Sequence, residues 1–348
     1  MEGYNPQRNR ATTENVEPPL RVRQTVVVGG NTQFGSPVGI AKNLLFVEGA
    51  RKLHVFALDS GEEQWNFDLP GFFISPAVAG DAVFVRAESG EDGFILALSA
   101  DAGLKLWQYK FPRVGSAYNN VGGHVTSPVV SEGLVLVGAA QTFHALEAET
   151  GREIWMFKTQ EPIASSATVG DNIVYFTDFT HLYALDLKTG KERWNFTYQD
   201  MTLLFAPIII EDQVVVTSGK TVYALDRHSG EVLWTKSLDA ESLTPSAAGG
   251  NMVYIKSVNQ LFALDRFSGE TIWSYQVTDF VSLPVITETQ IFIITRAGGN
   301  GQLRALRLSD GQEIWQSDHV QIANAAPIVA GGQVYVRTID GNVLAYAD

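Results

Sequence analysis

Two repeated patterns predict an all-β fold, an eight-bladed β-propeller of four-stranded antiparallel blades. A turn that ends in tryptophan occurs seven times, and a short strand that opens on proline or its equivalent occurs eight times. Successive copies of each pattern lie roughly 40 residues apart. This period, in a chain of short strands, is typical of propeller blades with four strands each.

The tryptophan turn reads, in its fullest form, Ala-Leu-Asp, three residues, Gly, three residues, Trp. The segment "ALDLKTGKERW", which ends at Trp194, is one full copy. All seven tryptophans of the chain end a full, looser or shortened copy: Trp65, Trp107, Trp155, Trp194, Trp234, Trp273 and Trp315. We expect Ala-Leu-Asp in the third strand of each blade and Trp in the fourth.

Each blade is predicted to open on a short apolar strand, as in "SPVVS" or "APIII". Proline is tolerated at the start of such a strand because it cannot donate to the sheet ladder. The eight openings are at Pro37, Pro76, Pro128, Ala167, Pro207, Pro245, Pro284 and Pro327. A turn and a second apolar strand, such as "NIVYFT", follow each opening.

Eight openings and seven tryptophan turns leave the last blade without its fourth strand. We expect Leu20–Val28, "LRVRQTVVV", to supply this strand and so to close the ring and remove its exposed edges. The prediction is a single propeller over residues 20–348, preceded by a disordered polar tail or linker over residues 1–19. Removal of residues 1–30 should then destabilise the protein severely, and removal of residues 1–17 should not.

The repeated motif residues have a structural explanation. Glycine tolerates the positive φ of a tight turn, and an aspartate side chain accepts hydrogen bonds from the amides of the same turn. A tryptophan at a fixed place wedges between neighbouring blades and buries on the order of 200 Å². We therefore interpret the seven tryptophans as blade-packing residues.

Composition excludes several classes of function. The net charge of −13 argues against nucleic acid or an anionic membrane surface as the main partner. The absence of cysteine excludes disulfides, thiolate metal sites and a cysteine nucleophile. No apolar stretch is long enough to span a membrane, and the polar N-terminal segment does not match a signal peptide. Whether that segment is the remnant of a removed signal or anchor stays open.

The repeat, with Ala-Leu-Asp, Gly and Trp at these offsets, resembles the PQQ-like (pyrroloquinoline quinone) propeller repeat over essentially residues 20–348. One branch of that superfamily comprises the quinoprotein alcohol dehydrogenases. The other is non-catalytic and is typified by the BamB-type outer-membrane assembly factors, which are eight-bladed envelope scaffolds. In length and in its mostly short loops, the chain is similar to the second branch.

The resemblance to the dehydrogenase branch implies features that this sequence lacks. Those enzymes carry a vicinal cysteine pair over the quinone, and a cluster of carboxylates and amides that binds Ca²⁺. This chain has no cysteine, and Asp178, Asp279 and Asp340 are scattered acids expected in loops or turns. Calcium requires six to eight oxygen ligands. We therefore predict a protein that is not an enzyme, with no catalytic residue, cofactor or metal.

The resemblance to the assembly-factor branch implies a loop between blades that presents apolar residues and an arginine to a barrel-assembly partner. The corresponding segment here is Tyr198–Pro207, "YQDMTLLFAP". Its apolar residues are Met201, Leu203, Leu204 and Phe205, and it contains no arginine. The resemblance therefore supports the role of a scaffold without identifying the same partner.

Other loops are expected on the same face of the propeller. The longest is Pro112–Val125, which carries Tyr118, and shorter loops carry Phe72, Phe73 and Phe280. Apolar residues clustered on exposed loops indicate a protein-binding surface. Alternatively, these side chains fold inward and cover the blade ends.

We therefore predict a non-enzymatic, monomeric scaffold or adaptor that binds protein partners, in a membrane or envelope complex outside the cytoplasm. No nucleic acid and no membrane span are expected. Two alternatives stay open. One is a small-ligand or sensor module, binding for example a saccharide in a central funnel lined by Asn119, Asn120 and His124. The other is a PQQ-dependent dehydrogenase.

Overall fold

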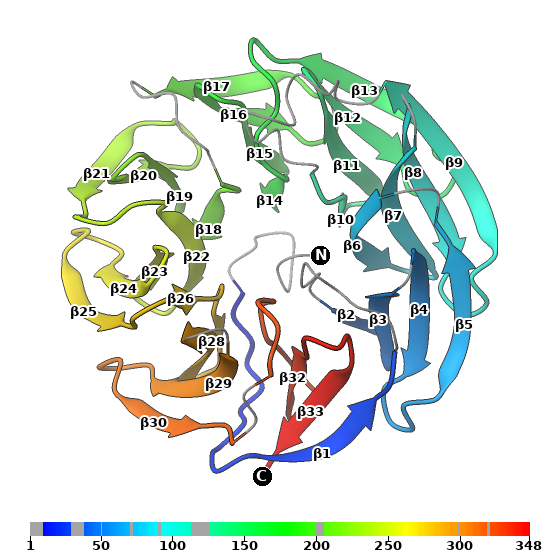
Figure 1. Ribbon diagram of the computed structural model, residues 1–348. Coiled ribbons are helices and arrows are strands. Elements are labelled where there is room, and N and C mark those ends of the chain that lie inside the picture. The colour runs from blue at the N-terminus through cyan, green and yellow to red at the C-terminus, as the bar shows by residue number, and fades with distance from the viewer. Residues whose placement is uncertain are drawn as a thin grey trace. The chain divides into compact units, whose positions relative to one another are not determined.

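The computed structural model describes residues 10–28, 38–49, 51–69, 72–89, 92–112, 126–198, 205–297, 300–318 and 321–348. In these residues the chain forms eight antiparallel sheets, the blades of an eight-bladed all-β propeller (Figure 1). The predicted fold class is confirmed. We number the blades 1 to 8 in the order of their proline openings, and call the strands of a blade first to fourth from its opening.

One compact unit contains Asp68–Asp239, and so includes blades 2 to 5. Blade 2 consists of β6 (Phe72–Ala79), β7 (Ala82–Ser89), β8 (Asp92–Ser99) and β9 (Lys105–Pro112). Blade 3 consists of β10 (Val129–Ser131), β11 (Leu134–Ala139), β12 (Thr142–Glu147) and β13 (Glu153–Lys158). Blade 4 consists of β14 (Thr168–Gly170), β15 (Ile173–Thr177), β16 (His181–Asp186) and β17 (Glu192–Thr197). Blade 5 consists of β18 (Ile208–Ile210), β19 (Gln213–Ser218), β20 (Thr221–Asp226) and β21 (Val232–Ser237).

The second compact unit contains Asn9–Phe67 and Ala240–Asp348, and so includes blades 6, 7, 8 and 1. Blade 6 consists of β22 (Thr244–Gly249), β23 (Met252–Lys256), β24 (Gln260–Asp265) and β25 (Thr271–Gln276). Blade 7 consists of β26 (Phe280–Val281), β27 (Val285–Ile286), β28 (Gln290–Ala297), β29 (Asn300–Arg307) and β30 (Glu313–Gln316). Blade 8 consists of β31 (Ile328–Ala330), β32 (Gln333–Arg337), β33 (Val343–Ala347) and β1 (Arg21–Val26). Blade 1 consists of β2 (Gly39–Ala41), β3 (Leu44–Gly49), β4 (Lys52–Ala57) and β5 (Glu63–Asp68).

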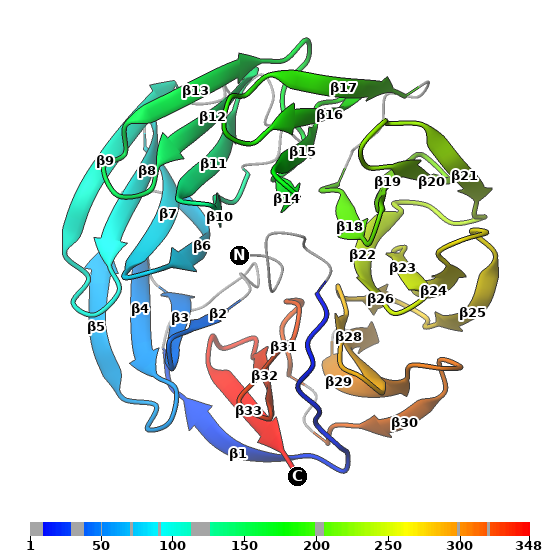
Figure 2. The same ribbon diagram turned by 180° about the vertical axis from the view of Figure 1, so that it is seen from behind.

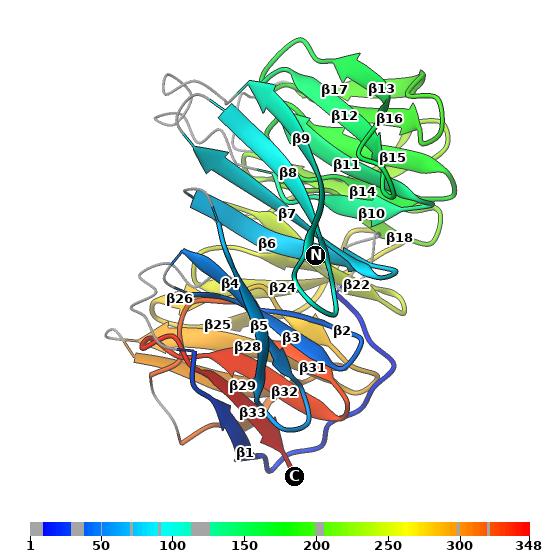
Figure 3. The ribbon, with the colours of Figure 1, turned by 90° about the vertical axis from the view of Figure 1, so that its right-hand side faces the viewer.

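The N-terminal strand completes the last blade, as predicted. β1 pairs antiparallel with β33, in a register that places Arg21 opposite Ala347 and Val26 opposite Val343. Figures 2 and 3 show β1 beside β33 from two further directions. The Nε of Arg23 also donates to the carbonyl of Asp348 at 3.0 Å. The first and last strands of the chain therefore lie side by side in one sheet.

Residues 10–20, which we name the strap, precede β1, and all of them except Leu20 lie within residues 1–19, for which a disordered tail was expected. The structure instead describes them against blades 7 and 8 of their own unit. The amide of Thr12 donates to the carbonyl of Ile286 at 2.9 Å. The side chains of Val16 and Leu20 are buried. The amide of Gly332, between β31 and β32, donates to the carboxylate of Glu14.

The strands differ in burial along each blade. Every residue of β11 is buried, and so is every residue of β15 and β19. These second strands are covered on both faces, which explains their continuous Val, Leu and Ile runs. The outermost strands, such as β13, alternate between exposed and buried residues. The apolar core therefore lies along the middle strands, where neighbouring blades face each other.

Tryptophan, glycine and aspartate of the repeat make the contacts that their positions suggest. The indole Nε1 of Trp107 donates to the carbonyl of Ala148 in the next blade at 2.9 Å. The same bond recurs from Trp155 to Leu187, from Trp194 to Arg227 and from Trp273 to Leu308. Each of these indoles also lies against the turn glycine of the following blade, for example Trp155 against Gly190.

Candidate partner-binding site

The links between blades and the turns between second and third strands lie at the same end of each blade. In blade 4 this end brings together residues 159–163, the turn 178–180 between β15 and β16, and Tyr198. Backbone bonds hold these parts in place: the amide of Ala164, directly after the link, donates to the carbonyl of Thr177, directly before the turn; the amide of Asp178 donates to the carbonyl of His181 and closes the turn; and the amide of Tyr198 donates to the carbonyl of Thr180. These contacts fix the start of the segment 198–207, in which the sequence predicted partner-binding residues.

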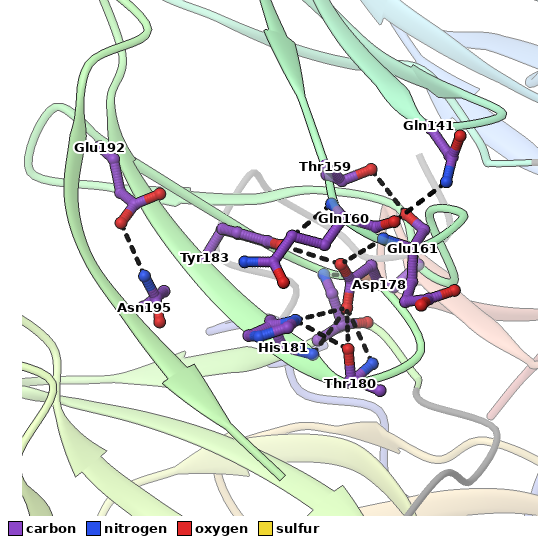
Figure 4. A network of polar contacts seen from close by, with 12 residues as sticks. Gln141, Thr159, Gln160, Glu161, Asp178, Thr180, His181, Tyr183, Glu192 and Asn195 are labelled. Atoms are coloured by element: carbon purple, nitrogen blue, oxygen red, sulfur yellow. Dashed lines mark hydrogen bonds and ion pairs between the residues drawn. The ribbon is translucent and has the colours of Figure 1, made fainter.

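The carboxylate of Asp178 is the centre of this arrangement and is fully buried. Its Oδ1 accepts from the amides of Thr180 at 2.8 Å and His181 at 2.6 Å. Its Oδ2 accepts from the hydroxyl of Tyr183 at 2.9 Å and from the amide of Glu161 at 3.2 Å (Figure 4). A buried carboxylate is stable where it has such donors. Asp178 thereby joins the 159–163 link to the turn.

The imidazole of His181 lies on the same carboxylate. Its Nδ1 is 2.8 Å from the Oγ1 of Thr180 and 3.3 Å from the Oδ1 of Asp178. The ring is 5.5 Å from that of Tyr183, at a tilt. Together, Thr180, Asp178 and the ring of Tyr183 fix the orientation of the imidazole at the blade end.

Tyr198 anchors the segment that follows it. Its ring packs edge-on against Phe196 at 5.4 Å and also contacts the ring of Tyr223. Burial raises the pKa of its hydroxyl well above the usual value. After residues 199–204 the chain continues at Phe205, which is half-buried. The segment therefore has a fixed aromatic residue at its start.

The structure places the other predicted partner-binding residues as follows. Met201, Leu203, Leu204 and Tyr118 lie outside the described residues, as do Asn119, Asn120 and His124 of the alternative ligand site. Phe72 and Phe73 were expected in a loop, and that location is wrong. They belong to β6, opposite Glu88 and Ala87 of β7, because the first hairpin of blade 2 is longer than the repeat indicates. Phe280 lies in the short strand β26, opposite Arg296.

Sequence reasoning missed two buried arginines near the same end of the blades. Arg86 ends the run "VFVR" in β7, and Arg337 ends the run "VYVR" in β32. The guanidinium of Arg86 donates to Thr126 Oγ1 at 2.8 Å, to Glu88 at 3.0 Å and to the carbonyl of Gly138 in blade 3. Burial lowers its pKa to about 10, although the Glu88 carboxylate opposes this.

Arg337 repeats this arrangement in the other unit. Its guanidinium donates to the carbonyl of Glu48 in blade 1, and Glu48 occupies the position in β3 that Gly138 occupies in β11. Burial lowers the pKa of Arg337 to about 10. The signal in the sequence was the run valine, aromatic residue, valine, arginine, which ends at Arg86 and again at Arg337. In both strands the arginine at this position joins one blade to the next.

Among the described residues, no group of three or more His, Cys, Asp or Glu side chains lies close enough together to hold a metal ion. In the same part of the chain, no helix is long and apolar enough to cross a membrane.

A family model described as outer membrane protein assembly factor BamB matches residues 10–140, 110–216, 139–298 and 279–348. The chain belongs to this family. BamB of Moranella endobia (strain PCIT) is 26% identical over 274 residues, which cover 69% of this chain and 68% of that protein. The recognised resemblance to the BamB-type branch is thus confirmed.

Solved structures share the fold of this BamB-family chain. The crystal structure of BamB from Moraxella catarrhalis has a TM-score of 0.74 and 17% identity, over 95% of this chain and 98% of that one. A europium-containing methanol dehydrogenase has a TM-score of 0.78 and 13% identity, over 100% and 97% of the two chains. At such identities the likeness shows the propeller fold alone, and it does not extend the dehydrogenase activity to this chain.

Proposed function

We propose that this BamB-family protein is a non-enzymatic scaffold that binds a protein partner in a complex for outer membrane protein assembly. The observation that carries the proposal is the family match, which extends from residue 10 to residue 348. The relative from Moranella endobia carries the name of an outer membrane protein assembly factor. By the same reasoning we place the protein outside the cytoplasm, at the periplasmic side of that membrane.

The partner-binding site of this proposal is the blade end around Asp178 and the segment 198–207. A binding surface is effective when it is held rigid before the partner arrives, because less conformational entropy is then lost on binding. The buried Asp178 and the packed ring of Tyr198 hold one end of the segment in this way. The apolar residues predicted within it, Leu203 and Leu204, would supply the contact area.

A site-specific photo-crosslinker tests this assignment. We would place it at Phe205 and, as a matched control, at Phe267, an exposed aromatic residue in the turn between the third and fourth strands of blade 6. We expect the Phe205 protein, incubated with native envelope fractions, to give one specific product with an outer-membrane assembly protein. The Phe267 protein should not give it, and Leu204→Asp should abolish it. Identical products from both positions would contradict the site, and no product from any fraction would contradict the scaffold function.

A further inference from the structure

The first residues of the strap form a parallel bridge with the edge of blade 7. Ala11 pairs in parallel with Ile286 of β27. The amide of Thr12 donates to the carbonyl of Ile286 at 2.9 Å, and the amide of Ile286 donates to the carbonyl of Arg10 at 3.0 Å. On its other side β27 pairs with β28. In Figure 1 the strap is the dark-blue trace that runs between blades 7 and 8.

Arg10 holds the strap by its side chain as well. The residue is only 5% exposed. Its Nε donates to the carbonyl of Pro284 at 2.8 Å, and its Nη2 lies 3.5 Å from the carbonyl of Pro327. These two prolines open blades 7 and 8, so one guanidinium joins adjacent blades. A buried cation is costly unless such acceptors are present, which makes the position selective for arginine.

The neighbouring residue packs on the apolar core of blades 6 and 7. Ala11 is half-buried against this core, which includes Ile286. Its Cβ lies 3.7 Å from the place that a Cβ on Gly249, the last residue of β22, would occupy. Beyond residue 12 the strap is held by polar contacts, including those of Glu14 and Glu17, and by the buried side chains of Val16 and Leu20.

These contacts together have the features of a peptide-binding site. Strand addition at an exposed edge supplies affinity through backbone bonds, and pockets for individual side chains supply specificity. Here the edge is that of β27, and the side chain held specifically is that of an arginine. Within residues 10–12 the bound segment forms two ladder bonds with Ile286, and the guanidinium of Arg10 donates to the carbonyl of Pro284.

We propose that the edge of β27 and the carbonyls of Pro284 and Pro327 form a binding site for an arginine-bearing peptide segment. The strap occupies this site in cis, and a segment of the same type from a partner protein binds by displacing it. A tethered segment competes at an effective concentration in the millimolar range, so the incoming segment must bind more tightly or the strap must first be released. This inference does not depend on the proposed scaffold function.

The test uses the full chain with a site-specific protease sequence inserted between Pro19 and Leu20. After cleavage and washing, a labelled synthetic peptide of residues 9–18 is titrated into the protein. We expect saturable one-to-one binding, and binding about tenfold or more weaker for the Arg10→Ala peptide, since charge-assisted bonds are lost. The uncut protein should bind the peptide much more weakly, because its own strap fills the site.

Three results would overturn the proposal. Equal binding of the wild-type and Arg10→Ala peptides would show that no arginine site exists. Absence of binding to a cut protein that keeps its tryptophan fluorescence and its folded circular dichroism would show that the edge accepts no segment in trans. Unfolding of the cut protein when the strap leaves would show that the strap is a part of the fold and not an occupant.

Discussion

Asp178 shows how one side chain positions a candidate binding surface at the residue scale. Its carboxylate accepts from the amide of Glu161 on the preceding link and from two amides of its own turn. These donors are buried or partly buried, and removal of the carboxylate takes away the acceptor that each of them has here. An unsatisfied buried donor costs more than the bond itself contributes. The residue is therefore important both for stability and for the shape of the blade end.

Replacement of Asp178 by alanine should lower the free energy of unfolding by about 2–4 kcal/mol, through the loss of several buried bonds. The matched control is Asp279→Ala, because Asp279 is an exposed acid at the same end of blade 6. We expect the control to change stability by less than about 0.5 kcal/mol. Urea denaturation measures the free energy of unfolding of both variants. Equal effects of the two substitutions would contradict the role assigned to Asp178.

Asp186, in the turn between β16 and β17, predicts a dependence of stability on pH. Arg193 and the hydroxyl and amide of Thr189 bind its carboxylate and lower its pKa to about 2. A lowered folded-state pKa means that the stabilisation is present above the unfolded-state value near 4. It is lost as the pH falls from about 4 to about 2. Because the side chain of Asp186 is 28% exposed and its partner Arg193 is 40% exposed, the effect should be a fraction of that expected for a buried pair.

Melting temperatures measured between pH 5 and pH 2 test this expectation. The difference in melting temperature between wild type and Asp186→Asn should be largest at pH 5 and should shrink toward pH 2. Asp279→Asn again serves as an exposed control. A difference that stays constant over the whole range would mean that the carboxylate charge contributes nothing.

At the scale of the element, the turn between third and fourth strands combines two separate constraints on its glycine. Gly151 has a φ of +74°, and a Cβ on it would lie 2.6 Å from the indole of Trp107 in the preceding blade. Gly133, in another turn of the same blade, has a φ of +75° with nothing within 4 Å of such a Cβ. Substitutions at Gly133 and Gly151 can therefore distinguish the cost of backbone strain from the cost of a steric conflict between blades.

Gly133→Ala should therefore cost only the strain of a positive φ, on the order of 1 kcal/mol. Gly151→Ala carries the same strain and also forces the Trp107 ring to move, so we expect a total loss of about 2–4 kcal/mol. Chemical denaturation gives both values. Similar losses for the two variants would show that the indole yields without cost.

The sequence allowed each blade to be predicted because the determinants of a blade are local. The proline opening, the Ala-Leu-Asp strand and the Gly-Trp turn lie within about 40 residues and repeat. Asp178 and Arg86 were not recognised as important because their partners come from other segments. Arg86 requires Thr126 and Gly138 of the next blade, and Asp178 requires the link at Glu161. Neither contact has a counterpart in every repeat, so periodicity does not reveal it.

At the scale of the whole molecule, the N-terminal segment connects parts of the chain that are far apart in sequence. The strap contacts blades 7 and 8, and β1 forms the fourth strand of blade 8. From sequence alone, the loss of residues 1–17 was not expected to destabilise the protein severely. The structure adds a moderate loss of stability to that prediction, because Arg10 and Val16 are buried against these blades.

Three proteins beginning at residues 9, 18 and 29 should therefore differ in a graded way. Loss of residues 9–17 removes the Arg10 bonds and the buried side chain of Val16, and we expect about 1–3 kcal/mol less stability with the fold retained. Loss of residues up to 28 also removes β1 and leaves β33 as an unpaired edge, which promotes unfolding of blade 8 and aggregation. Hydrogen exchange of the amides in Val343–Ala347, together with denaturation curves, measures both steps. If the proteins beginning at residues 18 and 29 were equally stable, β1 would not be needed to complete the blade.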